Sequence, residues 1–274
     1  MPTLEDNLRQ WNETYNWPQG GDEWSSFWGG ADAQWYNTIV PRIHAFLPAT
    51  AILEIAPGFG RWSHFLKDYC ERLVLVDISE KCIQACRERF NDFAHLEYHV
   101  NDGRSLSFID DGCIDFAFSF DSLVHVEDHV IKAYLAELAR VLTSDGIGVI
   151  HHSNLHQYQH YLSLINKMPY RVRRRLDRLH LIETLDAHWR APSMSASRFH
   201  EYARAVGLQC ISQEKVNWGS KRLTDCISVC TPRTSRWARP NKTLNNFHFM
   251  LEAQRSSLLS KLYGADSFGV DPTR

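Results

Sequence analysis

The hydrophobic pattern of residues 51–152 alternates between short apolar runs and longer segments with helical spacing. The apolar runs predict strands at 51–56, 73–77, 96–101, 114–120 and 146–152, with helices between them at 61–70, 79–90 and 127–142. Ser79 precedes the second of these helices and is a residue type that caps helix N-termini. Such alternation predicts a parallel sheet covered by helices on both faces.

The pattern changes after residue 153. Residues 154–190 lack strand signals and predict a helical insertion; a helix at 195–206, strands at 208–217 and 223–231, and a last helix at 242–263 follow. We therefore expect five parts: an aromatic N-terminal helical lid, a core, a helical insertion, the end of the core sheet and a C-terminal helical extension. Their boundaries are 1–48, 49–153, 154–194, 195–232 and 233–274.

The first apolar run leads into a turn with two glycines, Gly58 and Gly60, and the second run ends in Asp77. A turn without side chains lets the backbone approach a ligand, and a carboxylate after the second strand can accept both hydroxyls of a ribose. A third glycine, typical of dinucleotide sites, is missing. Glu54 precedes the turn, where a negative charge would repel a pyrophosphate and suit a cation. The pattern predicts a nucleoside site at the carboxyl end of the sheet.

The arrangement Glu54-x-Ala56-x-Gly58-x-Gly60 resembles motif I of the class I S-adenosylmethionine-dependent methyltransferases, an acidic residue followed by alternating glycines. Ala56 replaces the first glycine. The resemblance implies an α/β fold with a Rossmann-like, seven-stranded, mostly parallel sheet that ends in an antiparallel hairpin. It also implies a methyltransferase with S-adenosylmethionine as its cofactor.

The same resemblance assigns cofactor-binding roles. Glu54, Ala56, Gly58 and Gly60 would shape the methionine side of the pocket, and Asp77 would bind the ribose. The adenine would lie against Ile78, with Asp102 and Gly103 at its amino group, and Phe120 would lie beside the reacting methyl. Asp102 can also be an ordinary turn aspartate, because Asn-Asp-Gly favours turns.

Candidate bases follow the fourth and fifth predicted strands. A hydroxyl acceptor benefits from a base, and imidazole has a suitable pKa near neutrality. We expect His125 or His152 to be that base, with Asp121 as a rival or an orienting partner. A structural histidine is the alternative for either. His151 and His152 are neighbours on a strand, so one of them must face away from the other.

Aromatic residues gather before the core. Trp24, Trp28 and Trp35 form either a hydrophobic plug or a lid that contacts the acceptor. Later in the chain, His151, Trp189 and Arg190 are candidates for acceptor binding, and packing is their alternative role. The basic run 171–178 is either a solvated helix face or a dock for an anionic acceptor.

Composition narrows the class of protein. The net charge of −2 argues against nucleic-acid and membrane partners, and no apolar run reaches the roughly 18 residues of a membrane span. The seven cysteines include no Cys-x-x-Cys pair, so we expect no metal and a reducing, cytoplasmic location. The polar, acidic N-terminus does not resemble a secretory signal.

Three functions remain. The first is O-methylation of a small polar acceptor, such as a sugar unit or specialised metabolite. The second is N-methylation of a small amine or a peptide terminus, and the third is a non-catalytic regulatory subunit that binds S-adenosylmethionine. Residues 242–263 and the N-terminal aromatics are candidates for a homodimer interface.

Overall fold

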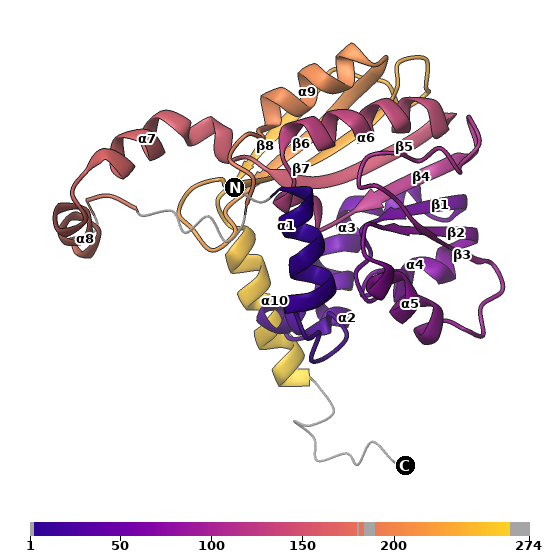
Figure 1. The fold of residues 1–274 in the computed structure, drawn as a ribbon, viewed down its shortest axis with the longest axis horizontal. Helices are drawn as coiled ribbons and strands as arrows, with labels where there is room; N and C mark the ends of the chain where they lie inside the picture. Colours follow the sequence, from indigo (N-terminus) through magenta and orange to yellow (C-terminus); the bar gives the residue numbers. More distant parts are fainter. Residues whose placement is uncertain (1–2, 180, 184–189, 264–274) are drawn as a thin grey trace.

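A mixed β-sheet organises the molecule. The computed structural model describes residues 3–179, 181–183 and 190–263. Eight strands lie in the order β3-β2-β1-β4-β5-β7-β6-β8 (Figure 1). Their bounds are Ala49–Ile55 (β1), Cys70–Asp77 (β2), Leu96–Val100 (β3), Ile114–Ser119 (β4), Leu142–Ser153 (β5), Leu208–Val216 (β6), Asp225–Pro232 (β7) and Lys242–Asn246 (β8).

Strands β1 to β5 pair in parallel, and β7 runs antiparallel to both β5 and β6. The predicted parallel core and terminal hairpin are confirmed. The prediction of seven strands and one helix over 242–263 was wrong, because β8 adds an eighth strand parallel to β6 before helix α10 (Phe249–Tyr263) begins. Four of the five β8 residues are exposed, so no apolar alternation marks this strand.

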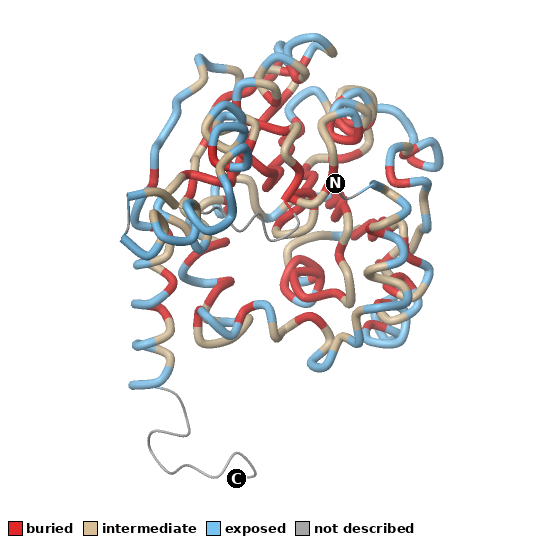
Figure 2. The backbone as a smooth tube through the Cα atoms, turned by 60° about the vertical axis from the view of Figure 1, so that its left-hand side comes forward, coloured by how far each residue is buried: buried red, intermediate tan, exposed pale blue. Residues whose placement is uncertain are grey.

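Helices cover both faces of the sheet, as predicted. Helices α6 (Asp128–Val141) and α9 (Ala196–Ala205) pack on the face that carries Leu53 and Val74. The other face, which carries Ile52 and Leu73, is covered by α4 (Ser63–Leu66), α5 (Glu80–Arg89), the N-terminal helices and α10. Figure 2 shows the buried residues concentrated along the strands and the helix faces turned toward them.

The N-terminal segment consists of short helical pieces, and the first of them lie near the carboxyl ends of the strands (Figure 1). They are α1 (Leu4–Arg9), η1 (Gln10–Thr14), η2 (Asp22–Trp28), α2 (Ala31–Gln34), η3 (Trp35–Ile39), α3 (Val40–Ile43) and η4 (His44–Phe46). Its second half belongs to the hydrophobic core, where Trp35 is fully buried and stacks on Phe65 at 4.7 Å. The segment is therefore a core plug in this half.

The predicted insertion is helical. It contains η7 (Leu155–Tyr158), α7 (Gln159–Lys167) and α8 (Tyr170–Arg178), and the last two extend beyond the body of the molecule (Figure 1). Two short helices elsewhere, η5 (Lys67–Tyr69) and η6 (Leu123–His125), complete the helices of the described residues. None of the helices in these residues combines the length and the apolar character that crossing a membrane requires.

Candidate active site

The turn after β1 brings its backbone close to neighbouring groups. Ala56, Gly58 and Gly60 have positive φ angles of 58°, 59° and 85°. A Cβ at Gly60 would lie 2.5 Å from the ring of Phe90, so this position requires glycine. Ala56 adopts the same conformation at a cost of about 1 kcal/mol, and its N–H donates to the carbonyl of Val76 at 2.7 Å. The turn is thus anchored to the end of β2.

Asp77 ends β2 directly beside this turn. Its carboxylate accepts hydrogen bonds from the N–H groups of Gly58, at 3.2 Å, and Ser79, at 2.9 Å. Burial raises its pKa to about 6, since a carboxylate loses hydration there. Ser79 also caps α5, as predicted, by accepting from the N–H of Cys82. Asp77 is therefore a buried carboxyl that two backbone donors hold in place.

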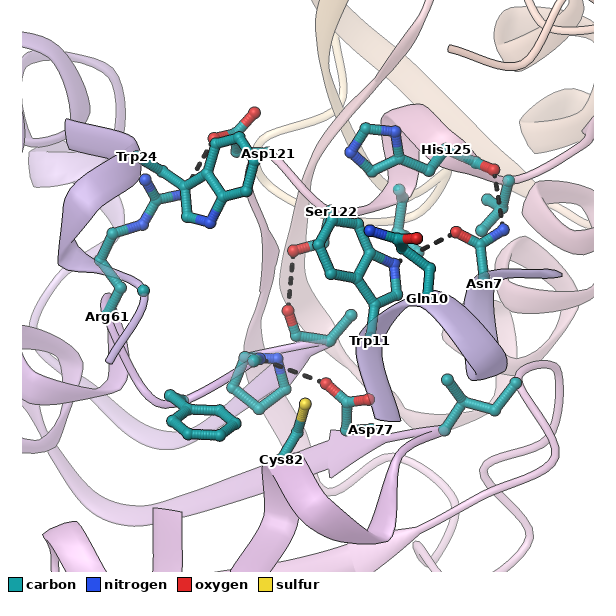
Figure 3. A pocket seen from close by; sticks show the side chains of 18 of the residues that line it. Asn7, Gln10, Trp11, Trp24, Arg61, Asp77, Cys82, Asp121, Ser122 and His125 are labelled. Carbon is teal, nitrogen blue, oxygen red and sulfur yellow. Dashed lines mark hydrogen bonds and ion pairs between the residues drawn. The ribbon is translucent and has the colours of Figure 1, made fainter. Parts of the chain in front are cut away.

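A cavity of about 600 Å³ lies at these strand ends (Figure 3). Its volume is within the range of small-molecule sites, roughly 300–1,000 Å³. The walls come from the N-terminal segment, the glycine turn, the end of β2 and the loop after β4. Of the residues predicted from the sequence, those that line it are Trp24, Trp28, Ala56, Gly58, Asp77, Ile78, Gly103, Asp121, His125 and Arg190.

Asp121 lies in the loop after β4 with a φ of 66°, which is unusual for a residue with a side chain. Its carboxylate accepts from Arg61 at 3.0 Å, and its N–H donates to Nδ1 of His151 at 3.1 Å. Such a conformation persists only where the surroundings determine it. These two contacts, one at each end of the residue, hold the Asp121 carboxylate at the cavity wall.

A buried polar chain connects His151 to the cavity. Because Nδ1 of His151 accepts from Asp121, we place its proton on Nε2, which faces the Asp225 carboxylate at 3.4 Å. Arg190 donates to the same carboxylate at 2.6 and 2.8 Å. Burial would raise the pKa of Asp225, but the charge of Arg190 lowers it to about 2. His151 itself is fully buried, and the chain reaches the cavity through Asp121 and Arg190, which both line it.

His125 lies in the loop after β4, in contact with helix α1. Its ring is 5.6 Å from that of Trp11, and its carbonyl accepts from the side chain of Asn7 at 3.1 Å. The indole N–H of Trp11 donates to the same Asn7 at 3.3 Å (Figure 3). The N-terminal segment therefore positions the backbone and the ring of His125.

His152 does not reach the cavity, which corrects its expected placement. Its Nδ1 lies 2.8 Å from the carbonyl of Ser153, and its Nε2 lies 2.8 Å from Oγ of Ser228. The ring stacks on Phe199 of α9 at 4.8 Å. Burial lowers its pKa to about 4. Alternate side chains of β5 point to opposite faces, and His152 is on the face away from Asp121.

Glu54 also lies away from the cavity, against the expectation that its charge faces the ligand. Its carboxyl group interacts with Oγ of Ser63 at 2.5 Å beneath the glycine turn. Burial raises its pKa to about 8, so this group is largely protonated at neutral pH. Glu54 connects β1 to the start of α4 and is not among the residues that line the cavity.

Five further predicted residues are not part of the described cavity wall. Asp102 is exposed and accepts hydrogen bonds from two backbone N–H groups of its own turn, at 2.7 and 2.9 Å. These contacts are those of an ordinary turn aspartate, the alternative role considered for this residue. Phe120 and Trp35 are buried in the hydrophobic core, and Gly60 packs against Phe90. Trp189 lies outside the described residues.

Several lining residues were not predicted. Arg61 directly follows Gly60 of the motif, and Trp11 and Trp17 belong to the aromatic N-terminal segment, so the sequence offered a signal for these three residues. Asn7, Gln10 and Trp218 had none, since only the fold brings them to the cavity. The polar and aromatic lining residues that were not predicted include Asn7, Gln10, Trp11, Trp17, Arg61 and Trp218.

Comparisons with known proteins agree with this geometry. A family model described as a methyltransferase domain matches residues 52–146. Nodulation protein S of Sinorhizobium fredii is 27% identical over 100 residues, which are 36% of this chain and 45% of that protein. The match thus spans less than half of this curated relative.

Solved structures share the fold. A protein of Pyrococcus horikoshii is 24% identical, with a TM-score of 0.51 over 74% of this chain and 93% of that chain. An S-adenosylmethionine dependent methyltransferase of Mesorhizobium loti is 16% identical, with a TM-score of 0.51 over 73% and 99%. Residues 52–146 therefore form a methyltransferase domain, and the chain shares the fold of proteins that use S-adenosylmethionine as their cofactor.

Proposed function

We propose that the protein transfers a methyl group from S-adenosylmethionine to a hydroxyl of a small polar acceptor, such as a sugar unit or a specialised metabolite, with His125 as the base. The observation that carries this proposal is that His125 and Asp121 line the same cavity as Asp77 and the glycine turn. The groups proposed to bind the donor and the group proposed to remove the proton therefore line the same cavity.

The end of the cavity beside Asp77 and the glycine turn, which we call the donor end, fits a nucleoside. Asp77 presents a buried carboxylate that can accept a pair of hydroxyls, and Ile78 and Gly103 offer apolar, side-chain-poor walls for a base. A Cβ at Gly103 would lie 3.0 Å from Leu4, so glycine keeps this slot open. Gly58 and Ala56 place backbone at the same end. These residues would hold the cofactor.

The proposed acceptor end is formed by Trp28 of η2, Arg190 and Trp218, which line the same cavity. Trp28 and Trp218 pack at 5.0 Å, and the Arg190 guanidinium lies 5.7 Å from the ring of Trp218. Indole faces suit the apolar faces of sugar or aromatic rings, and arginine can donate to ring hydroxyls. These contacts support a small ring-shaped acceptor.

When bound, the cofactor supplies an electrophilic methyl carbon on a sulfonium. The chain would align the acceptor oxygen with that carbon, and such alignment alone accelerates a displacement strongly. His125 would accept the hydroxyl proton, because its ring lines the cavity and neutral imidazole is an adequate base near pH 7. Asp121, paired with Arg61, would orient the acceptor.

N-methylation of a small amine or a peptide terminus is the alternative, and Asp121 with the surrounding tryptophans would suit a cationic amine. A regulatory subunit without catalysis is a third possibility, which the shared cavity of donor and base groups disfavours.

A cytoplasmic location is supported by the seven cysteines, all of them free thiols.

The test compares turnover of S-adenosylmethionine across panels of hydroxyl and amine acceptors. For the acceptor that reacts, His125→Ala is expected to lower kcat by about 10²- to 10⁴-fold while cofactor affinity stays unchanged. The exposed His129→Ala is the matched control. Unchanged kcat in His125→Ala would remove His125 as the base, and reaction with amines alone would favour the alternative.

A further inference from the structure

Helix α8 carries a concentrated positive charge that the proposed reaction does not use. Within Tyr170–Arg178 there are five arginines and one aspartate, in a chain whose net charge is −2. Arg171, Arg174, Arg175 and Arg178 are all exposed and follow the spacing i, i+3, i+4, i+7. This spacing places the four guanidinium groups along one side of the helix.

Helices α7 and α8 together form a projecting arm, which also exposes apolar side chains. Val172 of α8 is 47% exposed, and Leu179, which directly follows the helix, is 58% exposed. Tyr170, Leu164 of α7 and Leu181 after α8 are between 63% and 68% exposed. None of the α8 residues is buried, so packing against the body does not account for either set. A helix with separate basic and apolar sides is amphipathic without a partner in the described structure.

The arm is also placed where a large surface can reach it. Helices α7 and α8 extend beyond the body in Figure 1. The four arginines form no ion pair with another described residue, whereas Arg173 donates to Asn166 at 3.3 Å within the arm. The four exposed arginines of α8 and the exposed apolar side chains therefore lie on the same projecting arm.

We propose that α8 docks the protein onto an anionic lipid bilayer. Lipid headgroups complement the arginines, and the acyl boundary accepts the exposed Val172, Leu179 and Leu181. A nucleic acid would use the charge but would leave the apolar side chains in water. The expectation of no membrane partner rested on the net charge of the whole chain, which does not show how charge is distributed.

Docking of this kind needs no spanning helix. An amphipathic segment lies in the plane of the interface, and basic residues near an anionic surface each strengthen binding until salt screens them. Membrane docking does not require methyl transfer, so vesicle binding can be measured and interpreted independently of turnover.

The test sediments the full-length protein with vesicles of phosphatidylcholine alone or of phosphatidylcholine mixed with phosphatidylglycerol. We expect binding to the mixed vesicles only, and less of it as salt is added. Replacing Arg171, Arg174, Arg175 and Arg178 by Gln should lower the partition coefficient by roughly fivefold per arginine, or several hundredfold in all. Replacing the same four residues by Lys should retain binding.

A matched control removes the same charge elsewhere. Arg204, Arg233, Arg236 and Arg239 are exposed on other elements, and their replacement by Gln should leave most of the binding intact. Because the four α8 arginines are exposed, their variants are expected to keep the wild-type circular dichroism and Tm. Failure of the wild-type protein to bind mixed vesicles, equal binding to pure phosphatidylcholine, or equal losses in both Gln variants would overturn the proposal.

Discussion

Asp77 and Glu54 are buried carboxyls on either side of the same glycine turn, and they differ in their hydrogen-bond partners and in their access to the cavity. Asp77 lines the cavity and accepts two backbone N–H groups, whereas Glu54 interacts with Ser63 in the interior. Burial raises both pKa values, to about 6 and about 8. At pH 7 Asp77 is therefore mostly ionised and can accept ligand hydroxyls, while Glu54 is mostly protonated.

The raised pKa of Glu54 predicts a pH dependence of stability. Unfolded Glu54 loses its proton near pH 4.5 and folded Glu54 near pH 8, so the free energy of unfolding falls as pH rises between these values. Glu54→Gln removes this loss. We expect the variant to match the wild type near pH 5 and to exceed its stability by about 2 kcal/mol or more at pH 8.

Urea denaturation across this pH range measures the effect. Glu88→Gln, at an exposed position of α5, serves as the control and should run parallel to the wild type. A Glu54→Gln protein that is destabilised equally at both ends of the range would show that Glu54 is charged in the fold.

The positions of residues at the cavity could be predicted where they follow directly from the order of strands along the chain. The glycine turn, Asp77 and Ile78 are close in sequence and lie together at the cavity. His151 and His152 show the limit. Alternation along a strand requires them to face opposite sides, but only the packing of α9 against His152 decides which side each takes. Asn7 and Trp218 reach the cavity through long-range folding alone.

At the scale of elements, the first half of the N-terminal segment lies over the donor end of the cavity. Polar contacts attach it to α5, where Oγ of Ser79 donates to Asn12 at 2.9 Å and Nζ of Lys81 donates to the carbonyl of Tyr15 at 3.2 Å. Trp17 stacks on Phe59 of the glycine turn at 4.4 Å. We propose that this half acts as a lid over bound cofactor.

Trp17 provides the test of the lid. A Cβ on Gly58 would meet its ring at 2.8 Å, so the indole covers the turn directly. Trp17→Ala should speed dissociation of S-adenosylmethionine by up to about tenfold, since a ring pair contributes about 0.5–1.5 kcal/mol. Trp17→Phe should retain most of the effect. Stopped-flow displacement measures the rate, and an unchanged rate in Trp17→Ala would argue against a lid.

Elements were predictable where burial imposes a pattern. The five parallel strands and helices α5, α6 and α9 carry clear apolar periodicity because each packs on the core. Strand β8 carries none, since its sequence Lys-Thr-Leu-Asn-Asn is mostly exposed and, among the described residues, it pairs with β6 alone. An edge strand of this type is defined by pairing, which local sequence does not encode.

At the scale of the whole molecule, α10 exposes a second apolar surface. Leu251, Leu258, Leu259, Leu262 and Tyr263 are each between 48% and 69% exposed. Single exposed leucines are common, but a cluster on one helix marks an interaction site. We expect the protein to form a homodimer through α10.

The double variant Leu258→Glu, Leu262→Glu should shift the dimer to monomer in sedimentation equilibrium, because four glutamates would meet in the interface. Leu164→Glu on α7, at a position that is 64% exposed, is the matched control and should remain dimeric. A wild-type protein that sediments as a monomer at all concentrations would refute the dimer.

The central claim is that the cavity beside Asp77 binds S-adenosylmethionine. Isothermal titration of the wild-type protein should show saturable binding with one site per chain, weakening below about pH 6 as Asp77 becomes protonated. Asp77→Asn should raise Kd by about a hundredfold, since charge-assisted hydrogen bonds contribute roughly 1.5–3 kcal/mol each, and the exposed Asp92→Asn should change nothing. Equal affinity in Asp77→Asn and the wild type, or no saturable binding by the wild type, would contradict the account.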